Sequence, residues 1–440
     1  MSSPDPDLTP RIERERLRTA GSGPVASTAQ TDCCIVGGGP AGAVLALLLA
    51  RQGVAVTLLE SHRDFDRDFR GDVLQPAVLD LLGQLGLAER LLAVALARTS
   101  SMPIRAGAET AAFHDVSRLR TPYPFLTVVP QVRFLELVVG EARHCPTFRL
   151  VTGARVEALV RDDDGHADGD GHVRGVRYRA NNAWHEVRAQ VVVGADGRFS
   201  RLRGLARLEP VRTASPVDVL WFRLPRRDHD PAGGVFVGDG GWLVLQNRGA
   251  EWQAGYSLAK GGYAGLRAEG IGALRHSVGL RAPWLAGRAD ALRDWGQTSL
   301  LSVESCRLRR WYQPGLLLIG DAAHTMAAVG AVGISVAIQD AAVAANVLGP
   351  RLRAGRIGVT DLAAVQRRRE VPVRIVQAFQ RLVQGWLLSP PRGVVASRVP
   401  LGFRVLARIP LLRNLGARIF GLGVWPVRLS PASLGDHRWE

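Results

Sequence analysis

The segment Ile35–Glu60, IVGGGPAGAVLALLLARQGVAVTLLE, provides the framework from which the rest of this 440-residue chain can be interpreted. An apolar strand over Asp32–Val36 leads into a turn of glycines. A helix over Pro40–Gln52 follows, and a second apolar strand over Val54–Glu60 ends in an acid. Short apolar runs on either side of a longer apolar helix are typical of a parallel α/β sheet. The segment therefore predicts one strand–turn–helix–strand unit of such a sheet.

The glycines of the turn fit the GxGxxG motif, because they stand directly between a strand and a helix. The first, Gly37, would form the tight turn, and the second, Gly39, would let a pyrophosphate approach the backbone. The third, Gly42, would let the helix pack closely on the strand. The pyrophosphate would lie on free N–H groups at the start of the helix, and Glu60 would accept hydrogen bonds from ribose hydroxyls. The motif predicts an ADP-ribose site, which either FAD or NAD would fill.

The composition is that of a globular protein, since 47% of the residues are hydrophobic and 22% are charged. The length predicts roughly two or three domains. The net charge is +16, and because the chain has a single lysine, Lys260, arginine carries nearly all of the positive charge. The arginines are scattered along the chain, with no long basic run and no nucleic-acid-binding motif. We therefore expect no nucleic-acid partner.

The cysteines and the polar N-terminus bear on cellular location. Cys33 and Cys34 stand in the first strand, whereas Cys145 and Cys306 are isolated. No metal-ligand spacing is present, so we expect buried, reduced thiols and no metal site. Residues 1–30 are polar and lack an apolar signal segment, which predicts a disordered tail with at most a short helix over 11–18. No uninterrupted apolar run reaches membrane-spanning length, and these features favour a cytoplasmic protein.

Beyond the first unit the chain alternates between α/β and β-rich segments. A fully apolar strand over Gln190–Ala195 and another before Gly320 belong with the first strand. Residues 216–301 have a β pattern, and residues after 360 have a helical one. We therefore predict a nucleotide-binding α/β domain, an inserted β-sheet substrate domain and a helical C-terminal region. Their residues are, respectively, 31–100, 128–206 and 305–360; 101–127 and 207–304; and 361–440.

One aspartate-rich loop could be mistaken for a calcium site. Residues 162–172, DDDGHADGDGH, lack the spacing and the terminal glutamate of an EF-hand loop. We therefore expect a solvated connection between two strands of a hairpin.

Two further motifs distinguish FAD from NAD. Asp196, Gly197, Ser200 and Arg203 form DGxxSxxR after one strand, and residues 320–324 form GDAAH after another. With the glycine motif before them, the sequence resembles the class A flavoprotein monooxygenases, the 4-hydroxybenzoate hydroxylase-like family, which carries these three motifs in this order. The resemblance covers roughly residues 31–350. It implies a Rossmann-like FAD-binding domain with the β-sheet substrate domain inserted in it.

The resemblance also implies which positions contact FAD. Asp321 would bind the ribityl chain, and Asp196 with Gly197 would contact both FAD and NAD(P)H. Gln131 would lie near the ribityl chain or the phosphates, and Val156 would offer backbone groups to adenine. The complete set implied for the cofactor is Gly37, Gly39, Pro40, Ala41, Gly42, Glu60, Arg70, Gln131, Val156, Asp196, Gly197, Asp321, Gly330, Gly333 and Ile334.

The activity that the resemblance implies is hydroxylation of an aromatic or other electron-rich small molecule through a C4a-hydroperoxyflavin. NAD(P)H and O₂ would be consumed, and NAD(P)H would bind transiently because no second dinucleotide-binding unit is present. The inserted sheet offers candidates for the substrate pocket, of which Trp221 and Arg223 share one face of a strand. No catalytic acid or base can be named, and His324 is expected to be structural. The substrate candidates are Trp221, Arg223, Trp242, Gln246 and Tyr256.

The loop after GDAAH departs from the family pattern GDAAHxxxPxGGxGxN. Ala328 stands in place of the proline, Ala331 in place of a glycine, and Ser335 in place of the asparagine. Because proline fixes φ and glycine permits unusual φ, the loop beside the flavin is expected to differ in shape. An FAD-dependent dehydrogenase or oxidase that inserts no oxygen therefore stays open as an alternative.

Two other interpretations were weighed against these motifs. A flavin halogenase is disfavoured, because the WxWxIP signature of that branch is absent and no lysine lies near the glycine motif. A membrane-associated role would rest on residues 392–428, which mix arginine with apolar residues as an interfacial helix does. Pro400, Pro410 and several glycines interrupt this segment, which favours helices packed on the FAD-binding domain. The sequence does not determine the substrate, the choice between NADH and NADPH, or the oligomeric state.

Overall fold

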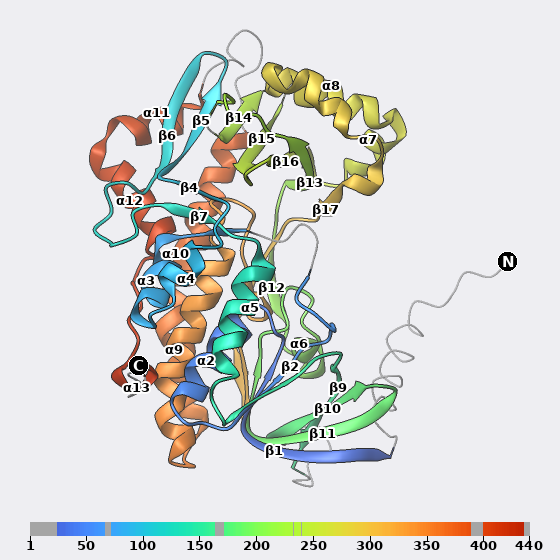
Figure 1. Cartoon of the computed structure of the whole chain (residues 1–440), viewed down its shortest axis with the longest axis vertical. Helices are drawn as coiled ribbons and strands as arrows, with labels where there is room; N and C mark the ends of the chain where they lie inside the picture. Colours follow the sequence, from blue (N-terminus) through green and yellow to red (C-terminus); the bar gives the residue numbers. More distant parts are fainter. Residues whose placement is uncertain are drawn as a thin grey trace, which may run out of the picture.

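A computed structural model describes residues 24–66, 72–162, 171–231, 233–238, 240–388 and 399–434 of the chain. These residues form two large sheets with helices packed on them, joined by a long helical segment (Figure 1). The predicted architecture is present: a Rossmann-like α/β fold, an inserted β-sheet and a helical C-terminal region. The predicted helix over 11–18 and most of the loop over 162–172 lie outside the described residues.

The first large sheet is built on the predicted strand–turn–helix–strand unit. Its strands run in the order β19-β20-β11-β1-β2-β8, and the strands from β20 to β8 pair in parallel. The strands β2 and β20 and the last four residues of β1 and β11 are buried, because helices cover this part of the sheet. The bounds are β1 Val25–Val36, β2 Val56–Leu59, β8 Phe148–Val151, β9 Arg155–Arg161, β10 Val173–Ala180, β11 Ala183–Gly194, β19 Tyr312–Gln313 and β20 Leu316–Leu318.

Two of these strands are longer than predicted. Strand β1 begins at Val25 and not at Asp32, because residues 25–31 pair with the first half of β11. Residues 25–30 therefore belong to the sheet and not to a disordered tail. The strand predicted over Gln190–Ala195 is the second half of β11, which begins at Ala183 and pairs with β1 along both halves. On its other edge β11 pairs first with β10 and then with β20, and β10 pairs antiparallel with β9 as a hairpin would.

Helix α2 occupies the centre of the helical layer on this sheet, between α5 and α9. It is buried from Ala41 to Ala50, because its sequence is apolar on nearly every side. Helix α3 ends at Gln84, and Gly86, with φ +74°, separates it from α4. The bounds are α2 Pro40–Arg51, α3 Pro76–Gln84, α4 Ala88–Leu92, α5 Gln131–Ala142, α6 Arg201–Leu205, α9 Gly333–Arg353 and α13 Pro431–Leu434.

The second large sheet joins two segments that are far apart in the sequence. Its seven strands run in the order β17-β13-β16-β15-β14-β5-β6, so residues 101–115 extend the sheet formed by residues 217–301. Helices α7 and α8 and the 3₁₀ segments η1 and η2 accompany it. The bounds are β5 Ser101–Ala106, β6 Glu109–Asp115, β13 Val217–Pro225, β14 Gly234–Gly238, β15 Gly241–Asn247, β16 Glu251–Ala259, β17 Ser299–Leu301, α7 Tyr263–Glu269, α8 Ile271–Arg281, η1 Pro283–Ala291 and η2 Trp295–Gln297.

Smaller sheets and the C-terminal helices link the two large sheets. One small sheet has the order β3-β7-β4 and the other β12-β18-β21. Helix α10 contacts both α9 and β15, and α11 and α12 pack against β6 (Figure 1). The bounds are β3 Val73–Leu74, β4 Ala97–Thr99, β7 Leu126–Val128, β12 Pro210–Ala214, β18 Glu304–Leu308, β21 His324–Thr325, η3 Gly320–Ala322, α10 Val359–Leu388, α11 Leu401–Arg408 and α12 Pro410–Gly421.

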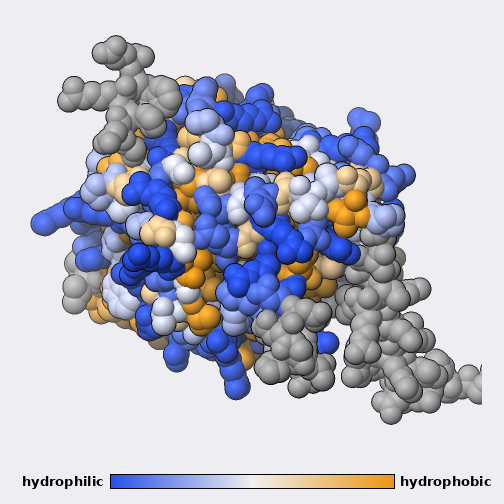
Figure 2. Space-filling model, turned by 90° about the horizontal axis from the view of Figure 1, so that it is seen from below, coloured by the Kyte–Doolittle hydropathy of each residue, from blue (hydrophilic) through white to orange (hydrophobic). Residues whose placement is uncertain are grey.

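The polar surface and the buried cysteines are those of an ordinary globular protein. The face shown in Figure 2 is mostly hydrophilic, with apolar side chains scattered between polar ones. All four cysteines are buried and carry free thiols, as expected. Burial raises the pKa of the Cys34 thiol to about 12, so it stays protonated at neutral pH. None of the described helices is long and apolar enough to cross a membrane.

Candidate functional site

The three glycines after β1 meet three different steric requirements. Gly37 has φ +105°, and a Cβ there would lie 2.4 Å from the carbonyl oxygen of Ala195. A Cβ on Gly42 would lie 1.9 Å from the carbonyl oxygen of Gly37, so any side chain would push α2 away from the strand. Gly39 has φ −72°, and its Cβ would meet nothing within 4 Å. Gly37 and Gly42 are therefore required by the packing of the protein itself, whereas the space beside Gly39 is open.

The start of α2 faces this open space without a capping side chain. Pro40 occupies the first turn, where its missing N–H is not needed. The first N–H groups of a helix have no partner within the helix, and the helix dipole makes this end positive. The uncapped start of α2 and the open space at Gly39 thus fit the pyrophosphate of a dinucleotide.

Glu60 is fixed beside the glycine turn. Its side chain is buried, its Oε2 accepts a hydrogen bond from the Gly38 N–H at 2.8 Å, and its Oε1 accepts one from the His62 N–H at 2.8 Å. The carboxylate lines the cavity described below. It is thus held where ribose hydroxyls of a dinucleotide could donate to it.

The DGxxSxxR motif over 196–203 is hydrogen-bonded to the GDAAH motif over 320–324. Asp196 Oδ2 accepts from the Leu202 N–H at 3.0 Å, and burial raises the pKa of its carboxyl group. Ser200 caps α6 by accepting from the Arg203 N–H at 2.9 Å. The Arg203 guanidinium donates to the carbonyl oxygen of Ala322 at 3.0 Å, which ties DGxxSxxR directly to GDAAH.

The third motif rests on a buried ionic network. The Gly320 N–H donates to Asp340 Oδ2 at 3.0 Å, His324 Nε2 lies 2.6 Å from the same oxygen, and Arg369 Nε donates to Asp340 Oδ1 at 2.7 Å. Burial alone would raise the pKa of Asp340, but His324 and Arg369 hold it below its usual value. These three side chains lie behind the cavity wall, which agrees with the structural role expected for His324, whereas Asp321 faces the cavity.

The loop that follows is held at its backbone by a glutamine from α10. Gln380 Nε2 donates to the carbonyl oxygens of Ala327 and Val329, both at 2.7 Å, and its Oε1 accepts from the Ala327 N–H at 3.2 Å. Gln380 is itself buried. The loop shape is therefore fixed by a side chain more than fifty residues away in the sequence.

A second glutamine holds the other end of the same loop. Gln75 Nε2 donates to the carbonyl oxygen of Gly330 at 2.8 Å. Gly330 has φ +76° and Ala331 has φ +50°, so both adopt left-handed backbone. Ala331, which replaces the family's glycine, thus takes a conformation that glycine adopts freely, and for alanine this costs roughly 1–2 kcal/mol.

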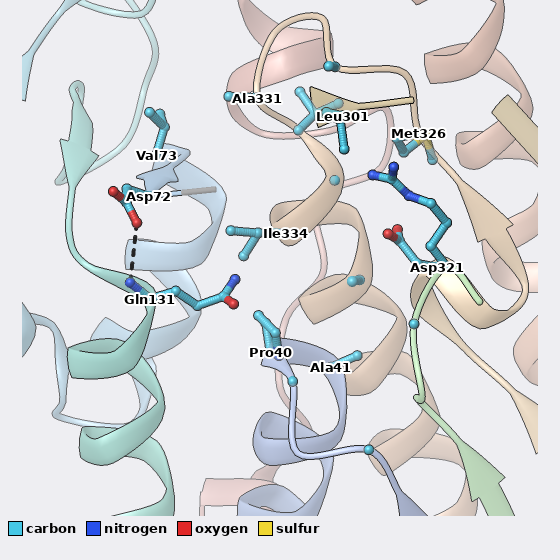
Figure 3. A pocket seen from close by; sticks show the side chains of 18 of the residues that line it. Pro40, Ala41, Asp72, Val73, Gln131, Leu301, Asp321, Met326, Ala331 and Ile334 are labelled. Atoms are coloured by element: carbon cyan, nitrogen blue, oxygen red, sulfur yellow. Dashed lines mark hydrogen bonds between the residues drawn. The ribbon is translucent and has the colours of Figure 1, made fainter. Parts of the chain in front are cut away.

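Two helix starts converge on the space between the glycine turn and this loop. Helix α9 begins at Gly333 without a capping side chain, and α5 begins at Gln131. In the view of Figure 3 the Gln131 side chain extends toward Ile334 and Pro40, and Asp321 lies across the space from them. The Gln131 N–H donates to Asp72 Oδ1 at 3.4 Å. The positive helix ends favour a ligand that carries or develops negative charge here.

One cavity of about 1190 Å³ joins these motifs to the seven-stranded sheet. One part of its lining comes from the three motifs, Glu60 and the starts of α5 and α9. The other part is mainly apolar and aromatic. Residues of this apolar part are Val73, Met102, Ile104, Leu126, Trp221, Val235, Trp242, Val244, Leu301 and Met326.

The predicted cofactor residues meet in this cavity with two exceptions. Gly42 packs behind the glycine turn and does not line the cavity, because its role is to let α2 approach Gly37. Arg70 lies outside the described residues. The cavity is lined by the other predicted positions, Gly37, Gly39, Pro40, Ala41, Glu60, Gln131, Val156, Asp196, Gly197, Asp321, Gly330, Gly333 and Ile334.

The predicted substrate residues divide into two groups. Trp221, Trp242 and Gln246 line the cavity. Arg223 shares the face of Trp221 but is exposed, 4.0 Å from Glu251, and lies outside the lining. Tyr256 was wrongly placed by the prediction, because it faces the core of the seven-stranded sheet, where the Arg281 guanidinium lies 3.9 Å from its ring centroid. Arg223 and Tyr256 could not be removed from the substrate candidates on sequence alone, because the sequence does not give the strand register.

Sequence reasoning missed a polar cluster at the cavity wall. Asp72 is buried and pairs with Arg248, and Arg248 also donates to Gln253 Oε1 at 2.7 Å. Burial raises the pKa of Asp72, and the neighbouring Arg248 offsets this only in part. Asp72 stands two positions after Arg70, a predicted cofactor residue. Arg248 and Gln253 come from a hairpin that carries no motif, so nothing in the sequence marked them.

His114 is the second omission. It lines the cavity from β6, and its Nε2 lies 2.9 Å from Gln75 Oε1. Because the Gln75 amide nitrogen donates to the Gly330 carbonyl, its oxygen is the acceptor and His114 Nε2 carries the proton. Burial lowers the pKa of His114 to about 4, so the imidazole is neutral at pH 7. A chain of hydrogen bonds thus runs from the seven-stranded sheet, through Gln75, to the loop at Gly330.

Comparison with known proteins identifies the relatives of this chain. Residues 30–232 and 276–378 match the family model described as an FAD binding domain. The chain is similar to 6-methylpretetramide 4-monooxygenase of Streptomyces rimosus, with 35% identity over 398 residues, which is 90% of this chain and 93% of that protein. It is also similar to protoasukamycin 4-monooxygenase of Streptomyces nodosus subsp. asukaensis, with 28% identity across 82% of this chain and 88% of that protein.

Solved structures show the same architecture. The fold is similar to that of p-nitrophenol 4-monooxygenase from Pseudomonas putida, with a TM-score of 0.74 and 20% identity over 93% of this chain and 100% of that one. At this identity the likeness establishes the fold and not the substrate.

Proposed function

This chain belongs to the FAD binding domain family, and from that premise we propose that it uses NAD(P)H and O₂ to hydroxylate an aromatic or other electron-rich small molecule. It is an FAD-dependent oxidoreductase of the monooxygenase class, as the resemblance implied. The observation that best supports the proposal is one cavity with two parts. The three sequence motifs line one part, and apolar and aromatic side chains line the other, which we call the apolar chamber. A cofactor and a substrate bound there would lie in the same cavity.

The residues of the cavity fit FAD. The open backbone at Gly39 would receive the pyrophosphate, Glu60 would bind ribose hydroxyls, and Asp321 would bind the ribityl chain. The start of α9 at Gly333 would lie beside the flavin ring and favour negative charge on it. Bound FAD supplies the redox chemistry, taking reducing equivalents from NAD(P)H and activating O₂ for transfer of one oxygen atom. The protein holds and orients the reactants and keeps water away from them.

The apolar chamber supports a flat, largely apolar substrate. Trp221 and Trp242 offer aromatic surfaces to an aromatic ring, and Gln246 offers an amide for a hydroxyl or carbonyl group. His114 is neutral at pH 7, so it adds no charge to the chamber. These properties suit a phenol or a polycyclic aromatic compound better than a small charged metabolite.

The alternative of a dehydrogenase or oxidase without oxygen insertion is not favoured. The relatives that span most of the chain are monooxygenases. The replaced loop positions had kept this alternative open. Ala331, however, adopts left-handed backbone as a glycine could, so this replacement does not by itself remove the loop shape.

The decisive experiment is isotope labelling. The purified FAD-loaded protein is given NADH or NADPH under ¹⁸O₂ with a panel of phenols and polyketide-like aromatic compounds. We expect one ¹⁸O atom in the product, and the matched control in H₂¹⁸O with unlabelled O₂ should give unlabelled product. Substrate turnover without O₂, with the flavin reduced directly by that substrate, would overturn the proposal.

A further inference from the structure

The C-terminal helices leave an apolar stripe on the outside of the molecule. Helices α11 and α12 contact each other and pack against β6, on the side of the molecule away from α7 and α8 (Figure 1). Five aliphatic residues along them are exposed, led by Leu401 at 71% and Leu415 at 51%. We call this the α11–α12 surface and define it by Leu401, Val405, Ile409, Leu412 and Leu415.

The stripe is not the buried face of these helices. On α11 Phe403 is buried, and it packs edge-on against Trp386 of α10 with ring centroids 5.2 Å apart. On α12 the buried residues include Ala417 and Phe420. Each helix thus buries one apolar face inside the protein and exposes a second, which ordinary packing does not require.

The segment that carries the stripe is strongly basic. Residues 371–435 contain nine arginines and no aspartate or glutamate, so they contribute more than half of the net charge of +16. Of these arginines, Arg408 is exposed at the end of α11 and Arg418 is exposed on α12. An acid that reaches the segment from β6, Glu109, accepts a hydrogen bond from the Val399 N–H at 3.0 Å.

We propose that the α11–α12 surface binds the face of an anionic phospholipid membrane. Exposed aliphatic side chains beside arginines match the two parts of such a surface, the acyl boundary and the negative headgroups. A second copy of this chain fits less well, because a two-fold contact through this surface would bring arginines of both copies together. The proposed contact is with the surface of the membrane, and none of the described helices is long and apolar enough to cross it.

The α11–α12 surface lies next to residues that line the cavity. Phe420, on the buried face of α12, lies against Gly330, where a Cβ would come 2.6 Å from its ring. Phe420 also contacts His114 edge-on, with ring centroids 5.7 Å apart. Leu387, near the end of α10, lines the cavity itself. A membrane bound at the α11–α12 surface would therefore lie close to the substrate side of the cavity, where an apolar substrate is needed.

Vesicle sedimentation tests the proposal with the full-length FAD-loaded protein. The probes are vesicles of equal parts phosphatidylglycerol and phosphatidylcholine, and vesicles of phosphatidylcholine alone. We expect sedimentation with the anionic vesicles at 0.1 M salt and its loss at 0.5 M salt, because salt screens the arginines. Leu401→Ser with Leu415→Ser should lower the partition coefficient roughly ten-fold. Arg408→Gln should lower it about five-fold.

Matched controls come from the opposite side of the molecule. Leu280→Ser, on α8 where the leucine is 54% exposed, and Arg267→Gln, on α7, should leave vesicle binding unchanged. Flavin absorbance and urea unfolding check that every variant is folded. The proposal is overturned if anionic vesicles do not sediment the protein, if both vesicle types do so equally, or if the control variants weaken binding as much as the surface variants. A dimer in lipid-free buffer that Leu401→Ser dissociates would assign the surface to a second copy and would also overturn it.

Discussion

Replacing Gly39 with alanine should weaken FAD binding without lowering the stability of the apoprotein. The backbone there, φ −72° and ψ −177°, is open to any residue, and the added methyl group would meet nothing within 4 Å. We expect the apoprotein to keep its stability or to gain up to about 1 kcal/mol, because alanine lowers the entropy of the unfolded chain. The same methyl group fills the space that a pyrophosphate would need. Losing one charge-assisted hydrogen bond there costs about 1.5–3 kcal/mol, which raises the Kd for FAD roughly 10- to 150-fold.

The matched control is Gly37→Ala. At Gly37 φ is +105° and the Cβ would lie 2.4 Å from the Ala195 carbonyl oxygen, so the apoprotein itself should lose stability, by at least about 1–2 kcal/mol. Urea unfolding of the two apoproteins and titration with FAD, followed by flavin fluorescence, measure both effects. If Gly39→Ala bound FAD as tightly as the unchanged protein, or lost as much stability as Gly37→Ala, the assignment of the open space to the pyrophosphate would be refuted.

Four further outcomes are expected. Asp321→Ala should weaken FAD binding by a factor of about 10 to 150 in the same titration, through loss of a charge-assisted hydrogen bond; unchanged affinity would remove Asp321 from the site. The folded pKa of His114, about 4, lies below the unfolded value of 6.5, so its contribution to stability is present above pH 6.5 and is lost as the pH falls toward 4. Between pH 7 and pH 5 this loss should be about 2 kcal/mol in urea unfolding and should vanish in His114→Asn; an equal loss in both proteins would contradict the assignment. Ala331→Gly should change the unfolding free energy by less than about 1 kcal/mol, because relief of left-handed strain and the added entropy of glycine oppose each other; a larger loss would mean that the methyl group itself is needed. A chain that begins at Thr31 should unfold more easily than one that begins at Pro24, by about 1–3 kcal/mol, since it lacks pairs between β1 and β11; equal stability would show that residues 25–30 are dispensable.

The local units of the fold and most of the cofactor site could be predicted from the sequence. Each of the three motifs joins a strand to the turn after it, and such units depend on residues within about ten positions of each other. The carboxyl ends of parallel strands meet at one edge of a sheet. The motifs carried by β1, β11 and β20 therefore had to converge once these strands were parallel, and Gly37, Asp196 and Asp321 do line one cavity.

The strand ends could not be predicted with the same accuracy. Apolar periodicity ends at Asp32, yet β1 continues back to Val25 because β11 offers backbone partners that far. Such pairing uses backbone groups, which every residue has, and so it leaves little trace in composition.

The tertiary structure alone decided which distant side chains meet. Gln75 reaches Gly330 across 255 positions, and Arg248 reaches Asp72 across 176. Whether Trp242 or Tyr256 faces the cavity depended on strand register, because a shift of one residue exchanges the two faces of a strand. Local propensity acts over a few residues, whereas these contacts arise from how whole sheets pack. The sequence by itself therefore determined the strand–turn–helix units and FAD as the cofactor. The packing of the sheets decided which side chains line the substrate part of the cavity.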